Sequence, residues 1–100
     1  MKNYTNEHIA ANCIRGSEAV GGKIYFDEKG FTFKSHDFNI QTGETRIEYA
    51  HIVKIGKRNT LEIVPNGISV FTKDGFEHKF VINKREEIME FIQSRIEVNQ

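Results

Sequence analysis

Turn signals divide this chain at short, regular intervals, and this spacing restricts the fold more than any other feature of the sequence. The signals are Gly21-Gly22, Glu28-Lys29-Gly30, Thr42-Gly43, Pro65-Asn66-Gly67 and Asp74-Gly75. Gly, Pro, Asn and Asp are the residues that most often interrupt helices and strands. The segments between them can hold short strands, but they are too short for the crossover helices of a parallel sheet. The spacing therefore predicts an antiparallel sheet.

Most segments between the signals alternate apolar and polar residues with a period of two, as half-buried strands do. In residues 45–49 we expect Ile47 and Tyr49 to point inward, and in residues 76–82 we expect Phe76 to share a face with Phe80 and Ile82. The predicted strands are 8–15, 21–26, 31–34, 45–49, 51–57, 68–72 and 76–82, with a short extra piece at 60–64. Asp27–Gly30 is a predicted hairpin turn. Asp74-Gly75 is predicted to form a two-residue turn with positive φ at both central residues.

The last segment changes to the three- and four-residue spacing of an amphipathic helix. We predict a helix over about 84–97, with Asn83 as N-cap and Glu86 completing a capping box. Its apolar face consists of Ile88, Phe91, Ile92 and Ile96. Such a helix is about 20 Å long, enough to cover one open end of a small barrel. We therefore expect one mainly β domain over residues 1–100, with a core at about 8–97, loose ends, about seven antiparallel strands and a C-terminal helix.

Four segments, in this order and spacing, resemble the GRAM domain family. They are EAVGGKIYF (18–26), GFTFK (30–34), FNIQTGE (38–44) and KRNTLEIVPNG (57–67). The resemblance covers about residues 10–93 and looks closest to the short stand-alone bacterial members. It implies a pleckstrin-homology-like barrel, no catalytic activity and a role in binding lipid or protein at membranes. The family has no ligand-binding signature that could be transferred to single residues.

Composition and charge exclude several classes of protein. Fourteen basic and fourteen acidic residues give a formal net charge of zero, whereas a nucleic-acid-binding domain is usually clearly basic. The longest apolar runs are three residues long, too short for a transmembrane helix or a secretory signal. Cys13 is the single cysteine, so no intrachain disulfide can form. We expect a cytoplasmic protein, peripheral at the membrane if it binds lipid, with no nucleic-acid partner.

No pattern in the chain predicts catalysis or metal binding. Cys13 and the four histidines lack the tight paired spacing of zinc sites. The acidic pairs Asp27-Glu28 and Glu86-Glu87 lie beside no recognisable base in the sequence. Gly21-Gly22 precedes a predicted strand rather than a helix, so it is not a phosphate loop. We therefore expect no enzymatic activity, no cofactor and no metal.

Cations gather in the middle of the chain. Residues 51–85 carry seven basic and three acidic groups, a net charge of +4. The candidate lipid- or ligand-binding residues are Lys34, His36, Lys54, Lys57 and Arg58, and the candidate membrane contacts in the 35–44 loop are Phe38 and Ile40. The alternative is structural: charges at a strand edge deter pairing between sheets, and the two apolar side chains pin their loop to the core.

Two classes of function stay open. The first is a non-catalytic module that binds anionic lipid or an anionic membrane surface. Each Lys or Arg near such a surface contributes about 1 kcal/mol, so a lone domain would bind weakly. The second is a protein-interaction adaptor or a homo-oligomer subunit, because barrels of this kind have open corners and a strand–helix groove that accept an added peptide strand.

Overall fold

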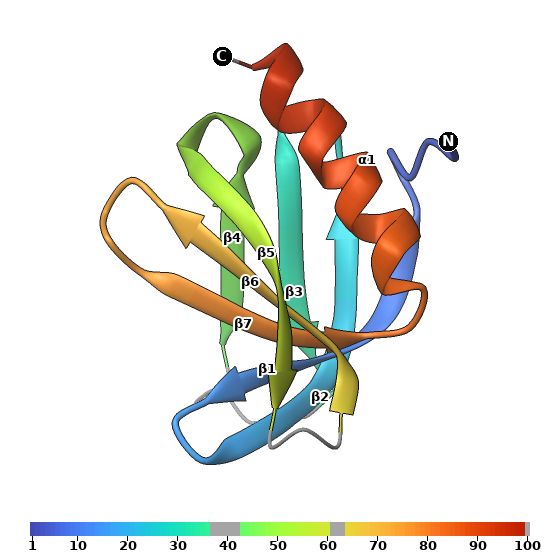
Figure 1. Ribbon diagram of the computed structural model, residues 1–100. Coiled ribbons are helices and arrows are strands. Elements are labelled where there is room, and N and C mark those ends of the chain that lie inside the picture. Colours follow the sequence, from blue (N-terminus) through green and yellow to red (C-terminus); the bar gives the residue numbers. More distant parts are fainter. Residues whose placement is uncertain (37–42, 61–63, 100) are drawn as a thin grey trace.

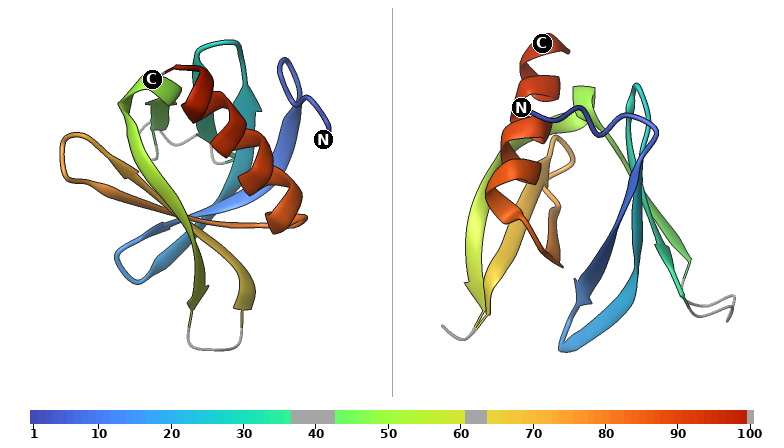
Figure 2. Two further views of the ribbon diagram at one scale, coloured as in Figure 1. Left: turned by 45° about the horizontal axis from the view of Figure 1, so that its top comes forward. Right: turned by 90° about the vertical axis from the view of Figure 1, so that its right-hand side faces the viewer.

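The computed structural model describes residues 1–36, 43–60 and 64–99, without the side chains of residues 59, 60, 64 and 65. The elements are β1 (His8–Arg15), β2 (Glu18–Phe26), β3 (Gly30–Ser35), β4 (Glu44–Glu48), the 3-10 turn η1 (Tyr49–His51), β5 (Ile52–Thr60), β6 (Val64–Thr72), β7 (Glu77–Ile82) and the helix α1 (Arg85–Val98). The strands form one antiparallel sheet in the order β4-β3-β2-β1-β7-β6-β5. This sheet curls into a half-barrel, and α1 lies over one of its open ends (Figures 1 and 2). The predicted mainly β architecture is therefore confirmed.

The alternation in the sequence sets the core. Phe31, Phe33 and Phe80 have no exposed surface, and Ile47 and Tyr49 are 2% and 1% exposed. All four residues of the predicted apolar helix face are buried as well. Burial of this face against the sheet holds α1 in place, because each large apolar side chain stabilises the fold by roughly 1.5–3 kcal/mol when it leaves water.

One glycine of the Gly21-Gly22 pair is required by the close approach of two strands. Gly22 is part of β2, and a Cβ at this position would lie 2.2 Å from the main-chain oxygen of Lys34 on β3. Only glycine permits such a close approach of two strands. The interpretation of this pair as a feature of backbone geometry is confirmed at Gly22, and both glycines lie within β2.

The predicted capping box at the start of α1 is wrong. The N-cap is Lys84, in the left-handed region at φ +57°, and no side chain caps the first turn. The chain turns sharply there between the end of β7 and the helix, which displaces Asn83 from the cap. The carboxylate of Glu86 instead forms an ion pair with Lys57 on β5. The sequence pattern could not reveal this competing partner.

The predicted two-residue turn between β6 and β7 is also wrong in detail. The Gly75 N–H donates to the Thr72 carbonyl (2.9 Å), and the Thr72 N–H donates to the Phe76 carbonyl (3.0 Å), so the loop has three residues. Positive φ occurs at Gly75 (+85°) but not at Asp74. This geometry matches a type I turn followed by a left-handed bulge residue. Phe76 consequently lies at the tip and is 58% exposed, not buried with Phe80 as predicted.

The N-terminal segment is attached to the barrel rather than loose. Tyr4 is 3% exposed, and its ring packs against Phe26 and Phe91. Main-chain hydrogen bonds join Asn6 and Glu7 to Phe26. No sequence signal predicts this packing of Tyr4, because Tyr4 is a single aromatic residue outside any periodic pattern. Residues 61–63 of the predicted extra piece at 60–64 lie outside the described residues.

Candidate functional site at the open corner of the barrel

β4 is the last strand at one side of the sheet, and its outer edge borders two adjoining hollows. The first, of about 340 Å³, lies between β4 and the β6–β7 turn and is lined in part by Ile47, His51 and Thr72. The second, of about 390 Å³, lies beside the β1–β2 turn and is lined in part by Cys13, Arg15 and Thr45. His78 lines both hollows. We refer to the two together as the corner groove.

The main chain of Arg46 and Glu48 points away from β3, toward this outer edge. The Tyr49 N–H donates to the Lys29 carbonyl (2.9 Å), so Tyr49 and Lys29 are a hydrogen-bonded pair of the β3–β4 ladder. Hydrogen-bonded and non-bonded pairs alternate along an antiparallel ladder. In the observed register, Arg46 opposite Thr32 and Glu48 opposite Gly30 are the non-bonded pairs. Their N–H and C=O groups therefore face outward, where the described residues supply no further strand.

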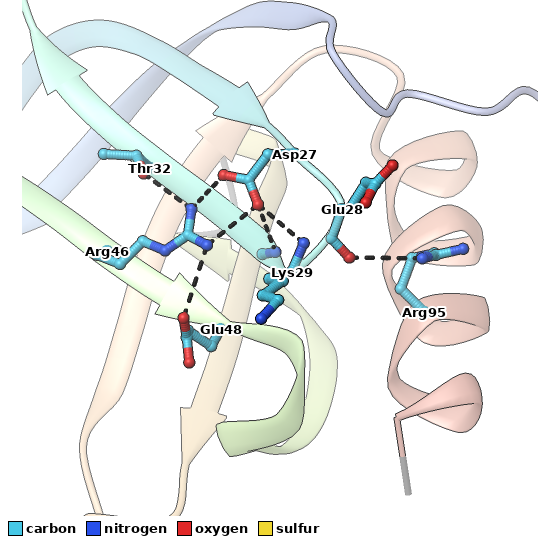
Figure 3. Close-up of polar contacts among 8 residues, drawn as sticks. Asp27, Glu28, Lys29, Thr32, Arg46, Glu48 and Arg95 are labelled. Carbon is cyan, nitrogen blue, oxygen red and sulfur yellow. Dashed lines mark hydrogen bonds and ion pairs between the residues drawn. The ribbon is translucent and has the colours of Figure 1, made fainter.

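A polar network holds β4 in position (Figure 3). The guanidinium of Arg46 donates two hydrogen bonds to the carboxylate of Asp27, the longer at 3.1 Å, and one to the hydroxyl of Thr32 at 3.2 Å. Asp27 also accepts the main-chain N–H groups of Lys29 and Gly30 at 2.8 and 3.0 Å. The hydrogen bonds from Arg46 lower the pKa of the Asp27 carboxyl from its usual value. Because these contacts hold β4 to β3 and to the β2–β3 turn, the outer edge is a fixed structure.

The β6–β7 turn forms the opposite wall of the groove. Asp74 accepts the Phe76 N–H (3.0 Å) and the hydroxyl of Thr72, and these hydrogen bonds lower the pKa of its carboxyl. The Lys73 N–H donates to the His51 carbonyl (2.9 Å), which closes the groove at the η1 end. The wall is thus as well defined as the β4 edge.

His78 lies between the two hollows and supports the exposed ring at the tip of the turn. Its ring centroid is 4.6 Å from that of Phe76, and its Nε2 is 3.3 Å from the hydroxyl of Thr72. Burial lowers the pKa of His78, and the nearby Asp74 carboxylate partly opposes this shift. A neutral imidazole at ordinary pH gives the floor of the groove an uncharged, partly apolar surface.

The three predicted cations on β5 have different surroundings. Lys54 is exposed, and its ammonium lies over the ring of Phe71 at 4.8 Å. Lys57 is ion-paired with Glu86 of α1, and Arg58 lies 3.8 Å from Glu77 of β7. Two of the three positive charges are therefore offset by carboxylates within the molecule.

Lys34 and His36 are separated from these cations by the width of the sheet. They belong to β3 and the residue after it, and β2, β1, β7 and β6 lie between β3 and β5. Lys34 is 3.9 Å from Glu44, and its ammonium lies 5.2 Å from the ring centroid of Tyr25. His36 follows β3 and lines a separate hollow of about 280 Å³ over β1 and β2. Phe38 and Ile40, the predicted membrane contacts, lie outside the described residues.

The sequence reasoning missed the corner groove. Its walls come from residues 13–16, 45–51 and 72–79, which meet only after the sheet has curled. A local signal existed in one place: Phe76 directly follows the turn residue Gly75, where a side chain is often exposed. Among the described residues, no group of three or more His, Cys, Asp or Glu side chains could hold a metal ion.

Comparisons with known proteins support the fold. No family model matches the chain, and no curated protein matches it. Solved structures with a similar fold include the C-terminal domain of an unknown protein from Leishmania infantum, with TM-score 0.75 and 19% identity over 90% of this chain and 81% of that one. The N-terminal PH domain of human ARAP2 gives a TM-score of 0.73 at 12% identity, over 94% and 81% of the two chains.

A third structure with a similar fold is Inner Membrane Complex Sub-compartment Protein 3 from Toxoplasma gondii, with TM-score 0.69 and 13% identity over 93% of this chain and 77% of that one. These likenesses establish a PH-like fold. The resemblance to the GRAM family in particular stays a prediction. In the part of the chain that the structure covers, no helix has the length and apolar character needed to span a membrane.

Proposed function

We propose that this protein is a non-catalytic binding module that takes up a short extended segment of a partner protein along the outer edge of β4. The observation that carries the proposal is the outward main chain of Arg46 and Glu48, which borders two hollows. An extended peptide can add to such an edge by main-chain hydrogen bonds, while hollows beside the edge accept its alternate side chains.

The rigidity of the corner favours this kind of binding. Arg46 and Asp27 hold the strand, and the Lys73–His51 hydrogen bond holds the opposite wall. A preformed edge loses little conformational entropy when a peptide binds, which leaves more of the contact energy for affinity. The exposed ring of Phe76, at the rim of the second hollow, offers the partner an apolar contact.

The test blocks the main chain of the edge without removing a hydrogen bond of the sheet. In Glu48→Pro, the lost N–H is one that points away from β3. Glu48 has φ −91° and ψ 140°, so a proline there needs a rotation of only about 10–25° in φ. Ile47 before it is in a strand, the conformation favoured before proline. Glu48→Ala is the matched control, because it removes the same side chain, with its ion pair to Arg46, and keeps the N–H.

Wild-type protein is used to select peptides from a random nonapeptide library displayed on phage. We expect the selected peptides to bind Glu48→Ala and to lose binding to Glu48→Pro, with both variants keeping the circular dichroism spectrum of the wild type. Amide hydrogen exchange at Arg46 and Glu48 should slow when a selected peptide is bound. Selection of no peptide, or equal binding to the two variants, would overturn the proposal.

A second candidate function is peripheral binding to an anionic membrane through β5. The observation in its favour is Lys54, which is exposed and lies within ion-pair distance of no carboxylate among the described residues. Lys57 lies on the same strand, and its partner Glu86 is on the exposed start of α1. Flotation with anionic vesicles tests this function separately, since β5 is at the opposite end of the sheet order from β4.

A further inference from the structure

The acidic side chains that line the corner groove all have partners within the molecule. Glu48 lies 3.8 Å from the guanidinium of Arg46. Asp74 accepts hydrogen bonds within its own turn. Glu77 accepts the hydroxyl of Ser69 at 2.6 Å and lies 3.8 Å from Arg58. Glu48 and Glu77 are therefore each held near an arginine, whereas the donors to Asp74 are uncharged and leave its negative charge in place.

Two lysines of the groove lack an oppositely charged partner among the described residues. Lys73 lines the hollow at the η1 end and is exposed, and Lys79 lines the hollow at the β1–β2 end and is half-buried. Neither ammonium lies within ion-pair distance of a carboxylate in the described part of the chain. Arg15 also lines the second hollow, but its guanidinium is engaged within the molecule: it donates to the Thr45 hydroxyl at 3.3 Å and lies over the ring of Phe33.

We infer that the segment that binds along β4 is acidic, with carboxylates that reach Lys73 at one end of the groove and Lys79 at the other. This inference rests on the proposed function and names the chemistry of its partner. Complementary charges fix the register of a bound segment and raise its association rate. Between the carboxylates, an apolar side chain of the segment would contact the rings of Phe76 and His78, whose centroids lie 4.6 Å apart and which both line the second hollow.

The same peptide selection tests the inference through the composition of the peptides. We expect peptides rich in Asp and Glu, and we expect replacement of those residues by Asn and Gln to weaken binding. The double variant Lys73→Glu with Lys79→Glu should lower the affinity for a selected peptide by roughly tenfold, since two attractions become two repulsions at partly exposed sites. The effect should shrink as salt is raised.

The matched control is Lys2→Glu with Lys23→Glu, which changes the net charge equally at two lysines that line neither hollow and belong to no hydrogen bond of the network around Arg46 and Asp27. It should leave the affinity within about twofold of the wild type, because these charges do not line the groove and salt weakens their action over longer distances. If the control weakens binding as much as the groove variant, only the net charge matters and the inference is wrong.

The outcomes also separate this inference from the proposed function. Neutral or basic peptides that bind wild type and not Glu48→Pro would overturn the acidic preference and leave the β4 site standing. Acidic peptides that bind Glu48→Pro as well as Glu48→Ala would overturn both. Flotation of the wild type, but not of the Lys73 and Lys79 double variant, with phosphatidylcholine vesicles containing phosphatidylserine would assign these lysines to a membrane and overturn the inference.

Discussion

The hydroxyl of Tyr4 donates a hydrogen bond to the carboxylate of Glu87 and so joins the first residues of the chain to the C-terminal helix. The Tyr4 ring reinforces this link, with its centroid 5.8 Å from that of Phe26 on β2 and 5.5 Å from that of Phe91 on α1. The N-terminal segment therefore contributes to the core and helps to hold the helix over the end of the barrel.

Tyr4→Phe should destabilise the protein by about 1–2 kcal/mol, because it keeps the ring and removes a hydrogen bond to a partly buried carboxylate. Tyr49→Phe is the matched control. The hydroxyl of Tyr49 is buried and has no hydrogen-bond partner among the described residues, so its removal should leave stability unchanged or slightly higher. Urea unfolding of both variants checks this prediction, and a larger loss for Tyr49→Phe than for Tyr4→Phe would contradict it.

The same two tyrosines predict a loss of stability at alkaline pH. Burial raises the pKa of both to about 12, and for Tyr4 the hydrogen bond to Glu87 adds to the increase. In the unfolded chain both hydroxyls have the ordinary tyrosine pKa of 10.0 and lose their protons near that pH. Between these values the folded state holds more protons than the unfolded state, so the free energy of unfolding falls as the pH rises. This stabilisation is fully present below pH 10.

Unfolding measured across that alkaline range should show a steep fall for the wild type. The double variant Tyr4→Phe with Tyr49→Phe should show a shallower one, since it lacks both buried hydroxyls. Equal slopes for the two proteins would mean that other groups control the alkaline transition.

Gly75→Val should destabilise the protein by about 1–2 kcal/mol. Gly75 has φ +85°, which a β-branched residue resists, and no atom lies within 4 Å of the added Cβ, so the cost is conformational. Gly56→Val is the control: its Cβ also meets no atom within 4 Å, but its φ is not positive and it lies within β5, where valine is favoured. Thermal unfolding should show a lower midpoint for the first variant alone.

If β5 binds anionic membranes, Lys54→Glu with Lys57→Glu should abolish that binding. We expect the wild type to float with phosphatidylserine vesicles at low salt and to lose most of this binding near 0.15 M salt, where the screening length is about 8 Å. Arg58 is left unchanged because it is half-buried beside Glu77, and a carboxylate there would disturb the fold. Failure of the wild type to float even at low salt would exclude this function for the lone domain.

The parts of the fold that depend on neighbours in the chain could be predicted from the sequence. The Asp27–Gly30 hairpin, the approximate positions of the strands and the apolar face of α1 all follow from turn residues and periodicity, which act over a few residues. The start of α1 could not be predicted, because the conformation of Lys84 and the partner of Glu86 depend on β5 and β7.

The candidate site could not be predicted, because it depends on contacts between residues far apart in the sequence, which periodicity does not reveal. Cations such as Lys57 and Arg58 are visible in the sequence, but the carboxylates of Glu86 and Glu77 that offset them come from other elements. The sequence contains even less information about the corner groove. Its defining property is that β4 is the last strand of the sheet, and strand order is decided by pairing between distant segments.

The shortness of β4 limits how much of a partner this module could distinguish. The strand has five residues, so at about 3.3 Å per residue a segment paired with it is read over roughly 17 Å. Because side chains alternate between the two sides of a strand, two or three of them would enter the groove. Recognition on that scale carries little sequence information and buries less than the roughly 1,200 Å² typical of long-lived complexes. A protein built this way would exchange its partners quickly and would accept several that share a short pattern.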